Sequence, residues 1–178
     1  PTGFAEPAIA FVEKELSQYK QLELSRTRKG ALVAKWKVES EEGVNYQEWT
    51  TSVLEEIRKD PLWNLEVYRL GLFIGDITWD DTEQLDKNSH TRGAADQIRR
   101  SLDSISANIA EGYSRSTGKD RARYFEYSLG EAREARDRYY KVRRALKQDV
   151  VVHRIKVLTH IVKMLNAFVP TQRKRGIR

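Results

Sequence analysis

Basic and aromatic side chains are interleaved in one segment of the second half of the chain. Six of the twelve residues in 136–147 are Lys or Arg, Asp137 is the only acidic one, and Tyr139 and Tyr140 lie among them. Cationic side chains bind phosphates and tyrosine rings stack on bases, so this composition is typical of a nucleic-acid contact. A solvated helix face balanced by Glu on a neighbouring helix has the same composition, and this interpretation stays open.

Two further basic clusters extend this prediction. One lies near residues 115–123, where one helix is expected to end and the next to begin, and the other is the C-terminal sequence TQRKRGIR, with four positive charges. The predicted nucleic-acid-binding residues are Arg115, Lys119, Arg121, Arg123, Arg136, Arg138, Tyr140, Lys141, Arg143, Arg144, Lys147, Arg173, Lys174 and Arg175.

The overall composition favours an anionic partner and excludes several kinds of chemistry. The formal net charge is +6 and the isoelectric point is about 9.5, which suits RNA, DNA or an acidic protein. The absence of Cys removes disulfides, thiol nucleophiles and Cys-ligated zinc, and fits a reducing compartment. No apolar run approaches the roughly 18 residues of a membrane span, and we see no secretory signal. We therefore expect a cytoplasmic protein that does not enter the membrane.

Hydrophobic periodicity predicts an all-α protein built on an antiparallel up-down four-helix bundle over residues 61–169. Helices are expected from Pro61 to near Trp79, over 91–113, from Thr117 to about Gln148, and from Asp149 to Pro170, with a polar loop at 80–90. The third helix carries a seam of apolar and small residues that permits close helix packing. This seam consists of Phe125, Ser128, Ala132, Ala135, Tyr139, Val142 and Leu146.

The first 60 residues are expected to form a mainly helical N-terminal extension that packs on the bundle or on a neighbouring subunit. Residues 5–25 have helical periodicity, whereas residues 31–38 (ALVAKWKV) fit either a short strand or a helix continuation. Asn45 and Glu48 form a capping-box pattern that starts a helix with an apolar face. The apolar face of this helix comprises Trp49, Val53, Leu54 and Ile57.

At the other end of the chain, residues 170–178 are expected to form a basic tail.

Short polar residues follow the apolar stripe of the helix at 91–113, which consists of Ile98, Leu102, Ile105 and Ile109. Three interpretations stay open: a solvent face, a half-buried structural seam joined by interhelical hydrogen bonds, or a ligand site. We favour the structural seam, which comprises Gln97, Arg100, Ser104, Asn108, Glu111, Gly112 and Glu134.

Signs of catalysis are weak, and we expect no enzymatic activity, catalytic residue, metal site or cofactor. His153 and His160 lie two helical turns apart, but no carboxylate spacing completes a metal site around them. Glu111 and Glu134 would suit a di-iron bundle only with Glu-x-x-His motifs, which the sequence lacks. We expect these two carboxylates to bind Arg99, Arg100 or Arg115 instead.

One long motif carries a family resemblance. Residues 97–115, QIRRSLDSISANIAEGYSR, closely resemble the signature of the four-helix bundle proteins also called 23S rRNA intervening-sequence proteins. Residues 65–72 (LEVYRLGL), 123–135 (RYFEYSLGEAREA) and 163–168 (KMLNAF) resemble other parts of the same pattern. The sequence departs from it at Ser101 and Gly71, where Ala is usual, and in the loop at 80–90.

The resemblance implies a non-enzymatic bundle that assembles into homo-oligomers, with a pentamer as the leading expectation. It also suggests a distant relation to the accessory protein of diversity-generating retroelements, which serves a reverse transcriptase. We therefore predict a homo-oligomer that binds RNA or DNA through basic helix faces, with a nucleic-acid-processing protein such as a reverse transcriptase as a further partner. The alternative is a protein-interaction scaffold whose basic face and N-terminal extension dock a protein.

Overall fold

The structure is a computed structural model that describes residues 22–26, 32–36 and 45–174. The chain divides into two compact units, Pro1–Glu39 and Ser40–Arg178. The predictions for residues 1–21 and for Arg175 lie outside the described residues.

The described part of the first unit is a β-hairpin. Strands β1 (Leu22–Arg26) and β2 (Leu32–Trp36) pair antiparallel, with Leu24 opposite Ala34. Strand β2 decides the open question at 31–38 in favour of a strand. The predicted helix over 5–25 is wrong for residues 22–25, where Leu22 and Leu24 alternate with polar residues at the two-residue period of a strand and the backbone pairs with β2.

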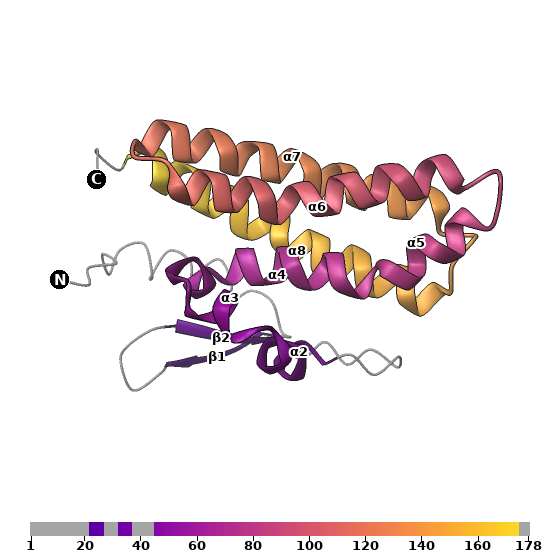
Figure 1. Cartoon of the computed structure of the whole chain (residues 1–178), viewed down its shortest axis with the longest axis horizontal. Helices are drawn as coiled ribbons and strands as arrows, with labels where there is room; N and C mark the ends of the chain where they lie inside the picture. The colour runs from indigo at the N-terminus through magenta and orange to yellow at the C-terminus, as the bar shows by residue number, and fades with distance from the viewer. Residues whose placement is uncertain (1–21, 27–31, 37–44, 175–178) are drawn as a thin grey trace. The chain divides into compact units, whose positions relative to one another are not determined.

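The second unit contains the predicted antiparallel four-helix bundle (Figure 1). Its first arm is divided into α4 (Glu66–Ile77) and α5 (Trp79–Asp86), and the other three arms are α6 (Arg92–Ser114), α7 (Gly118–Val142) and α8 (Gln148–Arg173). The all-α bundle is therefore confirmed. Thr117 accepts a hydrogen bond from the Asp120 backbone N–H and caps the start of α7.

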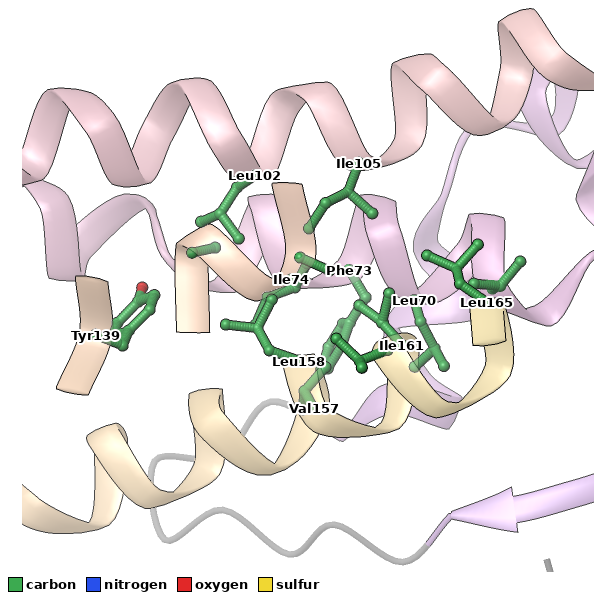
Figure 2. Packing of buried hydrophobic residues seen from close by; sticks show 14 of the residues in the cluster. Leu70, Phe73, Ile74, Leu102, Ile105, Tyr139, Val157, Leu158, Ile161 and Leu165 are labelled. Atoms are coloured by element: carbon green, nitrogen blue, oxygen red, sulfur yellow. The ribbon is translucent and has the colours of Figure 1, made fainter. Parts of the chain in front are cut away.

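Figure 2 shows the apolar core between the four arms. All four members of the predicted α6 stripe are at most 2% exposed: Ile98, Leu102, Ile105 and Ile109. The whole predicted α7 seam is buried as well, including Leu146 beyond the end of the helix. The apolar faces identified by periodicity therefore meet in one core.

Residues 45–60 pack on the bundle. They form α2 (Tyr46–Ser52) and α3 (Glu55–Lys59), followed by the 3-10 helix η1 (Pro61–Asn64). The Trp49 ring lies edge-on to Phe73 of α4 at 5.2 Å, and its indole N–H donates to Asp76 at 2.6 Å. The predicted cap at Asn45 is confirmed. The predicted apolar face is wrong at Leu54 and Ile57, which are exposed because the helix breaks after Ser52.

The predicted loop at 80–90 is largely the helix α5. This helix has a buried face although its sequence is mostly polar: Asp81, Thr82 and Leu85 are at most 6% exposed. The helical arm is interrupted at Thr78, whose hydroxyl donates to the Ile74 carbonyl at 2.7 Å. This local hydrogen bond competes with the regular helical pattern at the end of α4.

Two other helix boundaries differ from the prediction. Helix α7 ends at Val142 rather than near Gln148, and α8 is capped by Lys147, with Asp149 in its first turn. Pro170 lies inside α8 instead of ending it. Because Val169 and Gln172 are buried on either side of Pro170, their packing offsets the backbone hydrogen bond that proline cannot make.

Candidate nucleic-acid interface

Basic residues of α7 and α8 lie along one side of the bundle, which we call the α7–α8 basic face. Arg133 of α7 donates to Asn166 of α8 at 3.4 Å, and Arg136 donates to Thr159 at 3.4 Å, so these positions border the seam between the two helices. Residues three or four apart share a helix face. This spacing places two exposed lysines beside Thr159 and Asn166. The face comprises Arg133, Arg136, Tyr140, Arg144, Lys156 and Lys163.

The charge of the bundle is distributed unevenly. Residues 118–174 contain 15 Lys and Arg against six Asp and Glu, whereas residues 66–86 contain one Arg and six acidic residues. No salt bridge in the part of the chain that the structure describes involves Arg133, Arg144 or Lys156. Cations at this density on two adjacent helices create a positive potential that attracts a polyanion.

The segment 136–147 is less uniform than its composition suggested. Arg138 binds Glu134 at 3.1 Å and Lys141 binds Asp137 at 2.5 Å, both one helical turn apart, so neighbouring carboxylates partly neutralise them. Both interpretations of this segment therefore hold in part. Arg138 and Lys141 lie on a helix face whose charge is partly neutralised, whereas Arg136 and Arg144 belong to the basic face. Arg143 lies 4.2 Å from the ring centroid of Tyr140.

A second group of basic and aromatic residues, the α6–α7 corner cluster, consists of Arg115, Arg123, Tyr124 and Tyr127. Arg115 lies over the Tyr124 ring at 4.7 Å and donates to its hydroxyl at 2.7 Å, while its guanidinium also binds Glu111. Arg123 lies over the Tyr127 ring at 5.6 Å and donates through Nε to its hydroxyl at 2.6 Å. The two rings meet edge to face at 5.8 Å. The cluster is a continuous array of two cations and two rings.

Arg121 is not part of this exposed cluster, which corrects its prediction as a nucleic-acid contact. Its side chain is 2% exposed. Its Nε and Nη2 atoms donate to the carbonyl of Arg115 at 3.2 and 2.9 Å, so it caps the end of α6. The sequence contains a signal for this burial, because Arg121 lies four residues before Phe125 and continues the buried seam of α7.

The other predicted contacts divide by exposure and partner. Arg173 binds Glu126 of α7, whereas Lys119, Lys147 and Lys174 lie in exposed positions. Sequence reasoning missed Arg133, Lys156 and Lys163. The two lysines are seven residues apart, which places them on one face of α8, but their low density in the sequence concealed this alignment.

Among the described residues, the predicted polar seam makes no hydrogen bond between helices, and the bond that joins α6 to α7 comes from the apolar α7 seam. Ser128 of α7 donates to the Ile105 carbonyl of α6 at 2.9 Å, and this bond crosses between the helices. Glu111 and Glu134 instead bind Arg115 and Arg138 on their own helices. Over residues 45–174 no hydrogen-bond ladder joins the remaining seam residues Gln97, Arg100, Ser104 and Asn108.

A buried polar network connects α5, α7 and α8 at the other end of the bundle. Arg154 donates to Asp81 at 2.9 Å and to the Ile77 carbonyl at 2.9 Å, and Tyr139 also donates to Asp81 at 2.9 Å. Burial and the neighbouring carboxylate raise the pKa of Tyr139 well above its usual value. The phenol therefore stays protonated and donates to the carboxylate.

His153 extends this network. Its Nδ1 lies 2.8 Å from Nη1 of Arg154 and accepts a hydrogen bond from it, because a guanidinium can only donate. Burial and the charge of Arg154 lower the pKa of His153 to about 4. Burial and Lys163 lower the pKa of His160 to about 4 as well. Within the described ranges no group of three or more His, Asp and Glu residues is arranged to hold a metal ion.

The architecture defines a four-helix bundle protein with a basic face. The family of the 23S rRNA-intervening sequence protein matches residues 64–167, and the chain belongs to this family. A similar solved structure is that of a protein of unknown function from the S23 ribosomal protein family of Bacteroides thetaiotaomicron VPI-5482. It is 22% identical, with a TM-score of 0.54 over 58% of this chain and 97% of that chain, and supports the fold.

No curated protein matches the chain. None of the described helices is long and apolar enough to cross a membrane.

Proposed function

We propose that this protein binds nucleic acid, RNA or DNA, across the α7–α8 basic face and has no enzymatic activity of its own. The observation that carries the proposal is the concentration of cations on two adjacent helices, whereas the α4–α5 segment is acidic. The name of the family, which refers to an insert in 23S rRNA, is consistent with a nucleic-acid partner.

The geometry suits a phosphate backbone more than a single small anion. Lys156 and Lys163 of α8 are seven positions apart, which corresponds to about 10 Å along a helix. Phosphates along one strand are about 3.4 Å apart in the axial direction of a duplex. Several basic residues of the face therefore contact successive phosphates at once, and each contact releases counterions.

Binding should therefore depend strongly on salt. We expect fluorescence anisotropy with labelled RNA and DNA oligonucleotides to show affinity that falls linearly with salt on logarithmic axes. Replacing Arg133, Lys156 and Lys163 with Glu should weaken binding by about tenfold or more at low salt. It should also make the slope of affinity against salt shallower, by the amount that corresponds to the loss of roughly two to three phosphate contacts.

A matched control reverses three exposed charges outside the face, Lys87, Arg92 and Arg100, and changes the net charge by the same amount. This control should lose much less affinity than the variant on the face. Equal losses in both variants, or unchanged binding in the variant on the face, would reject the assignment of the α7–α8 basic face.

We also propose self-association into a ring, with the pentamer as the expected form. Several copies of the basic face on one particle would raise the avidity for a long nucleic acid. The proposal rests on the homo-oligomers that the family resemblance of residues 97–115 implies. Light scattering of the purified protein at low and high salt would count the subunits; a monomer at both would reject this proposal.

The exposed apolar residues of α2 and α3 favour a second candidate function, a protein-interaction scaffold. Leu54 is 72% exposed and Ile57 is 40% exposed, and burial of both in a complex would be favourable. Replacing both with Ser should abolish partner capture under this alternative and leave nucleic-acid binding unchanged. A reverse transcriptase is one partner to test. We propose that the protein acts in the cytoplasm.

A further inference from the structure

The α6–α7 corner cluster has a geometry that the α7–α8 basic face lacks. Its two arginines lie beside two rings that contact each other edge to face, so the array combines flat aromatic surfaces with positive charge. Tyr127 is 45% exposed, although a large aromatic side chain gains free energy when it is covered. The exposed ring is therefore available to a flat ligand.

Arg123 has donor capacity that the protein does not use. Only its Nε donates to Tyr127, and among the described residues no carboxylate lies within salt-bridge distance of it. A guanidinium has five N–H donors in a planar fork that matches a phosphate. The hydroxyl of Tyr127 holds the Nε end of this fork, and the arginine side chain is exposed, so a ligand can reach its other donors.

We propose that the corner cluster binds an unpaired nucleotide: its base stacks on the Arg123–Tyr127 pair and its phosphate accepts hydrogen bonds from Arg123. This inference rests on the proposed function, and deepens it by assigning single-stranded segments of RNA or DNA to this site. A duplex keeps its bases stacked on one another, so it can use the cations of the cluster but not the ring. Every base has a flat face, so stacking here tolerates any sequence.

Arg115 and Tyr124 act as the support of this site. The guanidinium of Arg115 is held by Glu111 and by the Tyr124 hydroxyl, which orients the Tyr124 ring. That ring contacts Tyr127 edge to face with an interplanar angle of 85°. The contact leaves Tyr127 in a defined position, so less side-chain entropy is lost when a base stacks on it.

The test compares Tyr127→Leu with Tyr127→Phe on a single-stranded oligonucleotide and on a duplex of similar length. Tyr127→Leu should weaken binding of single-stranded RNA and DNA by roughly tenfold and change duplex binding less than about twofold. Tyr127→Phe keeps the ring and should retain most single-strand affinity. Fluorescence of 2-aminopurine placed along the strand should be quenched on binding to the original protein, and less so with Tyr127→Leu.

The outcomes separate this inference from the function on which it rests. Unchanged single-strand affinity in Tyr127→Leu, together with a loss in the charge-reversed variant of the α7–α8 basic face, would overturn the corner site alone. Equal losses for single strands and duplex would overturn stacking, because they would show a contact to phosphates only. No binding of any oligonucleotide by the original protein would overturn both proposals. Helical circular dichroism of each variant confirms that it is folded.

Discussion

The two ends of the bundle use arginine and tyrosine in opposite ways. At the α5 end, Arg154 and Tyr139 are at most 7% exposed, and both donate to the single carboxylate of Asp81. At the α6–α7 corner, Arg123 and Tyr127 are exposed and bind mainly each other. The same pair of residue types is committed to packing at one end, whereas donors and ring surface remain open to solvent at the other.

This difference teaches that residue type alone does not identify a binding site. A buried guanidinium needs a compensating carboxylate because its loss of hydration costs several kcal/mol. An exposed guanidinium remains hydrated and can exchange water for a phosphate. We therefore expect changes at the α5 end to alter stability, and changes at the corner to alter binding.

The largest effect should come from Asp81→Ala. This change leaves the positive charge of Arg154 buried without its carboxylate, and we expect the free energy of unfolding to fall by about 3–5 kcal/mol. Urea denaturation followed by circular dichroism would measure it.

The matched control for Asp81→Ala is the double variant Asp81→Ala with Arg154→Met, which removes both charges. It should recover part of the lost stability, because no unpaired charge remains. A double variant less stable than Asp81→Ala would contradict a pairing role for Arg154.

Acidification should have the next largest effect. In the folded protein the pKa of His153 and of His160 is about 4, compared with 6.5 for an ordinary histidine. The unfolded chain therefore binds more protons between pH 6.5 and 4, and the free energy of unfolding falls as the pH falls through this window. Each histidine should account for about 1–2 kcal/mol by pH 5.

Denaturation curves at pH 7 and pH 5 would show this loss, and above pH 6.5 these two groups should add no pH dependence. Replacing both histidines with Gln should make the curve flatter between pH 6.5 and 4. An equally steep curve in the Gln variant would assign the effect to other groups.

Tyr139→Phe should have a smaller effect on the same network. The change removes one hydrogen bond to Asp81 but leaves the ring in the core and the carboxylate paired with Arg154. We expect a loss of about 1–2 kcal/mol in the free energy of unfolding, again measured with urea. A loss as large as that of Asp81→Ala would mean that the phenol, rather than the guanidinium, stabilises the carboxylate.

The smallest effect on stability should come from Arg123→Gln at the corner. Exposed cation–π contacts and surface charges contribute little, so the melting temperature should stay the same within the error of the measurement. Thermal denaturation would measure it. A clear fall in the melting temperature would remove the contrast between the two ends, because the corner would then also be structural.

Much of the bundle could be predicted from the sequence. Strong apolar periodicity fixed the faces of α6 and α7, since a helix buries residues three and four apart. The motif at 97–115 pointed to the family that matches residues 64–167.

Two of the misses share one physical cause, because Asp81 and Arg121 are polar residues in buried positions. Asp81 is buried because Arg154, 73 residues later, neutralises it, and no local pattern records such a distant partner. Arg121 was counted among exposed cations although its position continues the buried seam of α7. The hairpin strand β1 has the alternation of a strand, yet its pairing with β2 decides the structure.

Gly112 gives the corner an unusual sensitivity to a single methyl group. A Cβ atom at this position would lie 3.0 Å from the Cβ of Tyr124 and 3.1 Å from the Arg121 carbonyl. The backbone of α7 would have to move away from α6, and the Tyr124 ring would move with it. The missing side chain of Gly112 thus sets how closely α6 and α7 approach each other at the corner. Replacing Gly112 with Ala would therefore shift the Tyr124 ring without altering any residue that would touch a ligand.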